Sequence, residues 1–497
     1  MKKLKCASFS TELDIIDVES TFTRGLPGFS IVGLANSTIK ESTERVKATL
    51  LSQNFNFPAQ KITINLSPSD IPKNDSHFDL AIAILILFQK ENLDDFFVFG
   101  ELGLDGSIKS TASLFSILLF LSAKVQNAKV VVPKAIAQKA SMIPNLTIYA
   151  LENLAQAMDF FKEKNYENYH INNAHPLFEN AIEINNQKYI KNSIYPYDFK
   201  EVKGQENAKF ACIIAALGMH NILFEGSPGS GKRLPFIMPP QSLKEILAQN
   251  AYKSLNSLDD DFSASRVFRS PHHTSTRASI FGGGTKNAKI GEIALANGGV
   301  LFFDEFPHFS KQIIESLREP LEDFKILISR VNTKVIYETK FLFACAQNPC
   351  PCGNLFSKSL VCRCQEIEIK KYKNKISSPI LDRIDLYVAM DEISHEDKTS
   401  LSSEQMGEMV FKGFLFQKQR KQEEFNAKLN DEQLKQFCIL DSTANEILQK
   451  AINSYNLSQR GVNKTIKVAR TIADLEQSEL ILKTHILKAL SFRMRTT

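Results

Sequence analysis

The sequence has little glycine, little proline and no long apolar run. Of its 497 residues, 21 are glycine and 18 are proline, which excludes collagen-like and low-complexity chains. The longest near-continuous apolar run, Ala81–Phe88, is far shorter than the roughly 18 residues that span a bilayer. Behind the basic start, Glu12, Asp14 and Asp17 interrupt the apolar core that a signal peptide needs. We therefore expect a cytoplasmic protein without a membrane partner.

The chain has enough apolar residues for a large core and only a small excess of positive charge. Hydrophobic residues make up 43% and charged residues 23%, and the length suggests about three domains at roughly 150 residues each. The net charge of +5 arises in residues 455–497, which hold eight basic and three acidic side chains. Such a segment fits a phosphate-bearing partner, although a solvated helix face rich in lysine is the plainer interpretation.

The first third of the chain mixes strand-like and helical segments. Within residues 1–160, Lys61–Leu66 alternates as a strand and Leu80–Phe88 is apolar enough for a buried helix. Residues 161–194 are rich in asparagine and tyrosine and have little apolar periodicity. We interpret them as a linker that contains a short strand at Ala181–Ile184.

The second block, residues 195–395, alternates short apolar strands with helices. The clearest strands are Asn221–Phe224, Val300–Phe303 and Phe341–Ala346. This alternation predicts an α/β fold with a parallel, helix-covered sheet. Ile326–Ser329 and Lys334–Glu338 are predicted to form an inserted hairpin. Residues 396–497 have helical periodicity throughout and predict an all-helical lid.

A glycine-rich phosphate-binding motif follows the first of these strands. It consists of Gly226, Ser227, Pro228, Gly229, Ser230, Gly231 and Lys232. Its backbone N–H groups and the lysine would surround the phosphates of a nucleotide. The next residue is Arg233, where a Ser or Thr would supply a hydroxyl for Mg²⁺. Because prolines follow at once, we expect the helix behind the loop to have barely two turns.

Polar residues follow the two other strands. Asp304 and Glu305 come directly after Val300–Phe303, and we expect Asp304 to lie by Mg²⁺ and Glu305 to polarise the attacking water. The alternative is an acid that caps the next helix. Asn348 follows the strand Phe341–Ala346 and could orient water, although a turn before proline would also favour asparagine.

Arginine is scarce enough for its positions to carry information. The chain has 15 arginines and 45 lysines, so an arginine suggests a need for its planar, permanently charged fork. Arg383 and Arg470 are candidates, one to reach a neighbouring subunit's phosphate and the other to close the lid over the nucleotide of its own subunit. Arg460 competes for the second role. For each, a salt bridge on a helix surface remains an equal alternative.

Four of the eight cysteines are clustered. The other four are scattered and are interpreted as buried thiols in a reducing compartment. The cluster, Cys350, Cys352, Cys362 and Cys364, forms two pairs that could hold a structural Zn²⁺ in a tetrahedral site, with free thiols as the alternative. We call the segment that carries them, residues 350–364, the cysteine loop. The adjacent His272 and His273 are interpreted as loop contacts.

Taken in chain order, these motifs strongly resemble those of the magnesium-chelatase-like AAA+ proteins of the ComM/YifB type. Further matching segments are Tyr197-Asp198-Phe199, Val202-Lys203-Gly204-Gln205-Glu206, Arg269-Ser270-Pro271-His272-His273-Thr274, Gly291-Glu292-Ile293, Leu381-Asp382-Arg383-Ile384-Asp385 and Val468-Ala469-Arg470-Thr471-Ile472-Ala473-Asp474-Leu475. The resemblance covers nearly the whole chain.

The resemblance implies an ATPase that uses ATP and Mg²⁺, assembles as a homohexamer and acts on branched or single-stranded DNA as a branch-migration helicase during DNA uptake. It makes Lys232 a phosphate ligand, Asp304 and Glu305 the Walker B pair, and Asn348 the sensor 1 residue. It makes Arg383 the arginine finger and Arg470 the sensor 2 residue. Arg330 and Lys334 of the hairpin would lie near DNA in the pore. The cysteine loop is then an insertion in the AAA+ core.

Residues 1–160 contain the segments Leu66-Ser67-Pro68-Ser69-Asp70-Ile71-Pro72-Lys73, Phe78-Asp79-Leu80, Gly100-Glu101-Leu102 and Asp105-Gly106. In these segments they resemble the α+β fold of Lon proteases. Such proteases need a serine nucleophile and a lysine base. His77 stands where we would align the serine, and no lysine occurs between Lys109 and Lys124. We therefore expect this domain to lack the catalytic dyad and peptidase activity.

One departure from the family pattern leaves three hypotheses. Between Lys232 and Arg233 the chain lacks about five residues that family members carry, including the Mg²⁺-binding Ser or Thr. The protein is expected to be a DNA-remodelling motor, a nucleotide-binding but hydrolysis-deficient DNA-binding or assembly protein, or a chelatase-type ATPase that remodels a protein partner.

Overall fold

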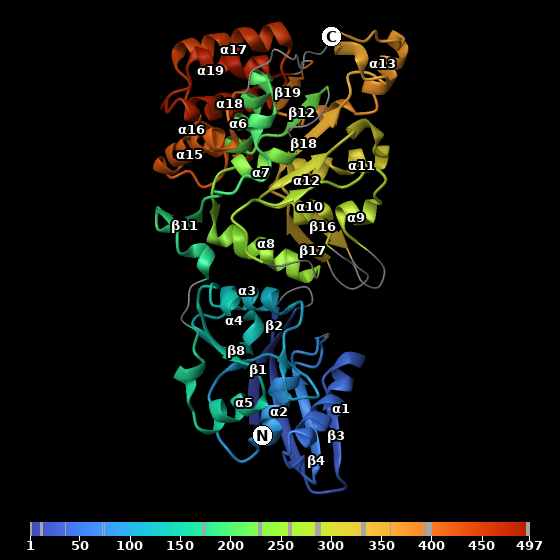
Figure 1. Ribbon diagram of the computed structural model, residues 1–497, viewed down its shortest axis with the longest axis vertical. Helices are drawn as coiled ribbons and strands as arrows, with labels where there is room; N and C mark the ends of the chain where they lie inside the picture. Colours follow the sequence, from blue (N-terminus) through green and yellow to red (C-terminus); the bar gives the residue numbers. More distant parts are fainter. Residues whose placement is uncertain are drawn as a thin grey trace. The chain divides into compact units, whose positions relative to one another are not determined.

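The computed structural model divides the chain into two compact units (Figure 1). It describes residues 2–9, 13–34, 36–71, 73, 75–171, 175–226, 231–256, 261–283, 290–329, 334–357, 359–390, 392 and 400–493. Unit 1 comprises Met1–Asn180 and Asn250–Phe262, and unit 2 comprises Ala181–Gln249 and Ser263–Thr497. The division after Asn180 falls inside the segment interpreted as a linker. Among the described residues, no helix is both long and apolar enough to cross a membrane.

Unit 1 is built on a mixed seven-stranded sheet. The strands, in order across the sheet, are β3 (Gly28–Val32), β4 (Lys61–Ser67), β2 (Leu13–Thr23), β1 (Lys2–Phe9), β5 (Phe97–Val98), β8 (Ala128–Pro133) and β9 (Leu146–Leu151). The pairs β1–β2 and β2–β4 are antiparallel and the others are parallel. A small hairpin pairs β6 (Glu101–Leu102) with β7 (Ile108–Lys109). The predicted strand at Lys61–Leu66 is thus confirmed.

The helices of unit 1 are α1 (Ser37–Ser52), α2 (Asp79–Leu87), α3 (Leu114–Lys124), α4 (Lys134–Ala140) and α5 (Leu154–Lys162). Helix α2 confirms the predicted buried helix, because its residues from Asp79 to Ile86 are all buried. The one charge among them is neutralised: Arg45 Nε donates to Asp79 Oδ2 at 2.6 Å, and the Leu102 backbone N–H donates to the same oxygen at 3.2 Å. Burial nevertheless raises the pKa of Asp79 above its ordinary value.

Unit 2 contains the predicted parallel sheet. Its five strands, in order across the sheet, are β14 (Phe268–Arg269), β15 (Val300–Phe303), β18 (Leu342–Gln347), β12 (Ile222–Glu225) and β19 (Leu386–Ala389). All four neighbouring pairs are parallel. Strands β12, β15 and β18 are buried along their whole length, as expected for the centre of a helix-covered sheet.

Mostly short helices surround this sheet, and a hairpin is inserted before β18. The helices are α6 (Glu206–Gly218), α7 (Leu234–Ile237), α8 (Leu243–Leu255), α9 (Arg277–Phe281), α10 (Glu292–Leu295), α11 (Lys311–Ser316), α12 (Arg318–Glu322), α13 (Glu366–Lys373) and α14 (Ser378–Leu381). The residues of α8 from Asn250 on belong to unit 1. The hairpin of β16 (Lys325–Ser329) and β17 (Lys334–Glu338) confirms its prediction. Strand β10 (Ile182–Ile184) confirms the short strand predicted at Ala181–Ile184. It pairs with β11 (Gln187–Ile190), and β11 pairs with β13 (Gln241–Ser242).

The C-terminal part of unit 2 is helical, as predicted. It consists of α15 (Ser403–Gln419), α16 (Asp431–Phe437), α17 (Ser442–Tyr455), α18 (Gln459–Leu475) and α19 (Lys483–Ser491). Helices α15 and α18 pack on α6. One continuous apolar core joins them to the sheet, since it includes Leu217 of α6, Ile222 of β12 and Ile472 of α18. The lid is therefore part of the same compact unit as the sheet.

Candidate nucleotide site

Three of the predicted motifs leave the parallel sheet of unit 2 at one edge. Strand β18 lies between β12 and β15, with Glu225 level with Gln347 and Phe303 level with Cys345. Because the strands are parallel, the residues that follow them emerge at the same edge, where ligands bind in open α/β sheets. The Gly226 backbone N–H donates to the Gln347 carbonyl at 2.9 Å. The start of the phosphate loop, Asn348 and Asp304 are thus brought together.

The segment after the phosphate loop is as short as predicted. Ser227, Pro228, Gly229 and Ser230 lie outside the described residues. A 3-10 turn at Gly231–Arg233 leads into the four-residue helix α7, and Lys232 is exposed. The helix behind the loop therefore has barely two turns.

Arg233 is bound to a segment on the N-terminal side of α6. Its Nε donates to the Asp198 carbonyl at 2.9 Å, and its Nη2 lies 2.5 Å from Glu201 Oε2. Its side chain is mostly buried. The position that would supply a hydroxyl to Mg²⁺ therefore holds a cation that is paired with a carboxylate.

The acidic pair at the end of β15 is exposed. The Glu305 backbone N–H donates to Asp304 Oδ1 at 2.9 Å, and Glu305 has a left-handed backbone with φ of 50°. Glu305 precedes the 3-10 helix Phe306–His308, but its side chain makes no capping hydrogen bond there. The capping alternative is thus not what holds the Glu305 carboxylate, and the pair can take up a cation and orient water.

His273 contacts the predicted catalytic glutamate. Its Nδ1 lies 3.4 Å from Glu305 Oε2. The loop that carries His273 follows β14, where Arg269 Nε and Nη2 lie 2.5 and 2.8 Å from the two carboxylate oxygens of Glu292. The interpretation of His273 as a loop contact therefore missed its neighbour, because sequence shows only that it follows β14.

Helix α13 adds two residues that sequence reasoning did not single out. Burial raises the pKa of the Tyr372 hydroxyl; the Asn348 backbone N–H opposes this shift and the negative charge of Glu305 adds to it. Lys373 Nζ lies 3.0 Å from Oε1 of Glu225, a buried carboxylate one residue before the phosphate loop. Gln347 Nε2 donates to the same oxygen at 3.2 Å. No local signal marks these contacts, since they depend on how α13 packs.

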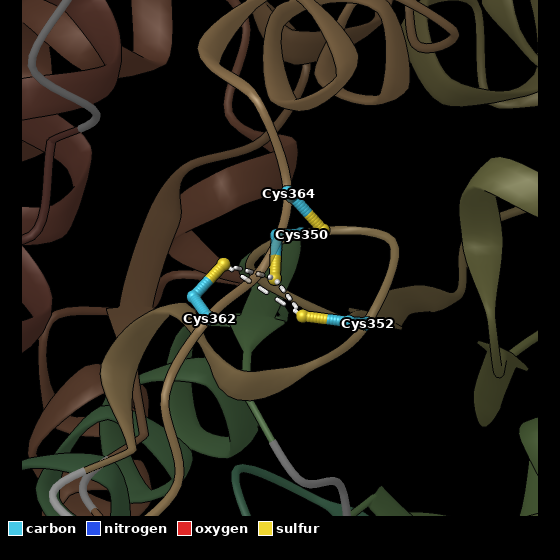
Figure 2. A group of neighbouring side chains, drawn as sticks. All are labelled: Cys350, Cys352, Cys362 and Cys364. Atoms are coloured by element: carbon cyan, nitrogen blue, oxygen red, sulfur yellow. Dashed lines mark hydrogen bonds between the residues drawn. The ribbon is translucent and has the colours of Figure 1, made fainter.

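The four clustered cysteines converge as a metal site requires (Figure 2). The Cys350 sulfur lies 3.4 Å from that of Cys352 and 3.6 Å from that of Cys362, and the latter two are 3.7 Å apart. All four sulfurs lie within 4.8 Å of one another. Thiolates about 2.3 Å from a tetrahedral zinc ion are about 3.8 Å apart, so the donor set fits Zn²⁺.

One of these thiols is biased towards the form that binds metal. The backbone N–H groups of Asn354 and Arg363 lower the pKa of Cys352 to about 6. Such donors stabilise the thiolate, which is the form that coordinates a metal. Desolvation in contrast raises the pKa of Cys364 to about 12, so the case for zinc rests on the convergence of the four sulfurs.

Family descriptions of magnesium chelatase match most of the chain. "Magnesium chelatase, subunit ChlI" matches residues 198–398, "Subunit ChlI of Mg-chelatase" matches 18–136, and "Magnesium chelatase, subunit ChlI C-terminal" matches 400–493. Competence protein ComM of Haemophilus influenzae is 33% identical over 98% of this chain and 96% of its own length. The chain belongs to the magnesium-chelatase-like ComM/YifB family. YifB of Salmonella typhimurium is likewise 33% identical, over 96% of this chain and 94% of its own.

Membership of the ComM/YifB family confirms the resemblance and places the chain among the AAA+ ATPases. Protein Rv2897c of Mycobacterium tuberculosis, 31% identical over 97% of this chain and 96% of its own, extends the similarity to another group of bacteria. The parallel sheet with its helical lid is the fold that the resemblance implied.

The three candidate arginines have different surroundings. Arg383 follows α14 and forms an ion pair with Glu322 of α12. Arg460, near the start of α18, is 62% exposed and pairs with the same carboxylate. Arg470 is 1% exposed, and its Nε lies 2.9 Å from Asp474 Oδ1.

The partners described for Arg470 all belong to the lid. Its Nη1 donates to the Glu479 carbonyl at 2.7 Å and its Nη2 to the Ser478 carbonyl, while Arg420 also binds Asp474 at 2.6 Å. Burial lowers the pKa of Arg470. Among the described residues, Arg470 is thus bound within the lid, whereas Arg460, the competing residue, is exposed.

Much of the basic C-terminal segment also makes internal contacts. Lys464 Nζ lies 3.1 Å from Asp385 Oδ1, Lys467 donates to the Leu429 carbonyl at 2.6 Å, and Arg493 donates to the Gly461 carbonyl at 2.9 Å. These charges serve the packing of the lid, which weakens the case for a phosphate-bearing partner on this segment.

The hairpin expected to contact DNA is present, but its tip is not described. Arg330 lies outside the described residues, and Lys334 is placed as the first residue of β17, opposite Ser329. Leu327 and Ile336 form an exposed cross-strand pair, 47% and 63% exposed. The described part of the hairpin thus shows apolar side chains to solvent.

Proposed function

We propose that this protein is an ATP-driven DNA motor, a homohexameric helicase that promotes branch migration during DNA uptake or recombination. The observation that carries the proposal is the exposed pair Asp304 and Glu305 at the sheet edge where the phosphate loop begins. We also propose that it works in the cytoplasm, where its free cysteines would stay reduced.

The residues of the site divide the work between binding and proton transfer. Amides of the loop and Lys232 would hold the phosphates of ATP, and Asp304 would hold Mg²⁺. The Mg²⁺ ion would neutralise charge that develops on the transferred phosphoryl group. Glu305 would accept a proton from the attacking water, and Asn348 would orient that water.

Two arginines would complete the site, one from a neighbouring subunit and one from the lid of the same subunit. Arg383 is proposed as the finger that reaches the neighbour's nucleotide. For the lid arginine we favour Arg460 over Arg470, since the exposed guanidinium of Arg460 can change partner at little cost whereas that of Arg470 is buried in its own network.

The test of the motor is ATP turnover by the purified protein with and without four-way junction DNA. We expect DNA-stimulated hydrolysis that is lost in Glu305→Gln. Absence of hydrolysis with every form of DNA would contradict the motor.

The pairing of Arg233 with Glu201 favours a second candidate, a protein that binds nucleotide but does not hydrolyse it. Nucleotide affinity measured alongside turnover separates the two: ATP binding without hydrolysis supports the second candidate, and absence of binding contradicts both. Restoring the missing segment with its Ser or Thr should then produce turnover.

DNA contact by the hairpin is tested by charge removal. Arg330→Ala and Lys334→Ala should each weaken DNA binding and reduce the dependence of its affinity on salt by about one ion. A protein with no salt-sensitive DNA affinity would instead support a chelatase-type ATPase that remodels a protein partner.

Zinc in the cysteine loop is tested by metal analysis. We expect about one equivalent of zinc per chain in the purified protein and its loss in Cys362→Ser. A metal-free protein with four titratable thiols in the loop would contradict the zinc site.

A further inference from the structure

The base of the inserted hairpin is bound to helix α12. The Thr339 backbone N–H donates to the Phe324 carbonyl at 2.8 Å, which closes the hairpin just outside its last strand pair. The Thr339 hydroxyl donates to the Pro320 carbonyl of α12 at 3.1 Å. One side of the hairpin base therefore has a fixed support.

On its other side, the hairpin base contacts the lid at the connection between α15 and α16. Lys340 Nζ lies 2.5 Å from Glu424 Oε1. Lys428 Nζ donates to the Phe341 carbonyl at 2.9 Å and lies 4.8 Å from the centre of the Phe324 ring. An ion pair, a hydrogen bond and a cation–ring contact thus join the lid to the hairpin base.

The part of the lid that makes these contacts is itself bound to α18. We call it the lid turn, residues 422–428. Its Asn426 is fully buried, and Asn426 Nδ2 donates to Asp474 Oδ2 at 2.8 Å and to Thr471 Oγ1 at 2.9 Å, both on α18. Gln422 Nε2 donates to Asn426 Oδ1 at 2.9 Å. Because these hydrogen bonds are shielded from water, we expect the lid turn to move with α18 as one body.

The hairpin is long enough to enlarge a movement of its base. Strands β16 and β17 pair over five residues each, and a strand rises about 3.3 Å per residue, so the paired part extends about 16 Å. A small tilt at Lys340 therefore displaces Ser329 and Lys334, at the far end of the pairing, by a larger distance.

We propose that Glu424 and Lys428 are positioning residues through which the lid sets the position of the hairpin. A shift of the lid carries the lid turn with it, and the hairpin base follows through Lys340 and the Phe341 carbonyl. That nucleotide drives the shift and that the hairpin acts on DNA rest on the proposed function. The link between the lid turn and the hairpin does not.

The link is tested by amide hydrogen exchange of the full-length protein without nucleotide. The Lys340 and Glu424 side chains are 39% and 33% exposed, so they can be changed with little effect on folding. Glu424→Lys sets like charges against each other and should speed exchange in β16 and β17 about fivefold, whereas Glu424→Gln should have a smaller effect. The exchanged pair Lys340→Glu/Glu424→Lys should restore the slow exchange.

The matched control breaks another ion pair of the lid. Glu476 Oε1 lies 2.9 Å from Lys488 Nζ, and Glu476→Lys should leave exchange in the hairpin unchanged. The link is overturned if Glu424→Lys and Glu476→Lys affect the hairpin equally, or if the exchanged pair fails to restore it.

The positioning role is tested by repeating the exchange with the β,γ-imido analogue of ATP, which is not hydrolysed. We expect the analogue to change exchange in the hairpin of the wild type and of the exchanged pair, but not of Glu424→Lys. Calorimetric titration should show that all three bind the analogue with affinities within about twofold, since the ion pair does not touch nucleotide. An unchanged hairpin in the nucleotide-bound wild type, or an equal response in Glu424→Lys, would overturn this role. A protein that binds no nucleotide would instead contradict the proposed function, and the exchange without nucleotide would still decide whether the link exists.

Discussion

Two aspartates that follow a phenylalanine, one in each unit, have opposite surroundings. Asp79 of unit 1 lies buried at the start of α2, where Arg45 and a backbone N–H occupy its oxygens. Asp304 of unit 2 lies exposed beside Glu305 at the end of a buried strand. The Phe-Asp pattern is the same, but the first carboxylate is bound within the fold and the second is exposed. Burial and partners, rather than the motif, distinguish structural acids from functional ones.

The largest effect should come from removing the structural acid. Asp79→Ala leaves Arg45 facing a buried site without its partner, and breaking such a pair costs about 3–5 kcal/mol of unfolding free energy. Urea unfolding of the full-length protein should show this loss, while ATP turnover per folded molecule stays unchanged. The exposed Glu44→Ala is the matched control, with an expected change within about 0.5 kcal/mol. Equal unfolding free energies of Asp79→Ala and wild type would contradict the structural role of Asp79.

Removing the functional acid should have the reverse outcome. Glu305→Gln should lower ATP turnover by about 10²–10³-fold, the size of a lost general base, and leave the unfolding free energy within about 0.5 kcal/mol of wild type. Steady-state hydrolysis and urea unfolding on the same preparation check both halves. Asp323→Asn, an exposed acid in the same unit, should change neither. A strongly destabilised Glu305→Gln would mean that Glu305 is structural after all.

A buried lysine in unit 2 shows that burial, and not the unit in which a charged residue lies, decides whether its charge affects stability. Lys428 of unit 2 donates from Nζ to the Phe341 carbonyl at 2.9 Å, and desolvation lowers its pKa to about 8. Between pH 8 and about 10.5 the unfolded chain therefore binds more protons than the folded one, so stability should rise with pH by up to about 3 kcal/mol. In Lys428→Met this contribution should vanish. If the unfolding free energies of wild type and Lys428→Met changed with pH in the same way, the lowered pKa of Lys428 would be contradicted.

The smallest effect should come from a neighbour of the functional acid. His273→Gln removes the imidazole next to Glu305 and should lower ATP turnover about 3- to 10-fold by loosening the position of that carboxylate. His272→Gln is the control, because the His272 Nδ1 pairs with Thr274 Oγ1 at 2.8 Å and not with the acid. Equal effects of the two substitutions would show a general role of the loop rather than contact with Glu305.

Much of the fold could be predicted from the sequence because its strands are short, apolar and well separated. The runs at β12, β15 and β18 define three central strands, and parallel order then brings the residues after them to one edge. The position of Asp304, Glu305 and Asn348 at that edge could be predicted in this way, since only the ends of strands were needed. The four cysteines could be grouped for a similar reason, because they lie in one loop.

The residues that could not be predicted depend on packing between distant segments. His273, Tyr372 and Lys373 reach the site from a loop and from α13, and nothing in their local pattern shows it. The internal contacts of Arg470, a candidate for phosphate contact by its family motif, were not predicted either. A signal was available: Asp474 lies four residues later on the same helix, a spacing that favours an internal ion pair.

The contact between Lys373 and Glu225 ties the cysteine loop to the electrostatics of phosphate binding. Helix α13 begins two residues after Cys364, and its last residue neutralises the carboxylate that stands just before Gly226. A chain whose cysteine loop lost its order would lose this ion pair and leave the Glu225 carboxylate with the hydrogen bond from Gln347 but no neutralising charge. We therefore expect the order of the cysteine loop to affect the charge next to Gly226.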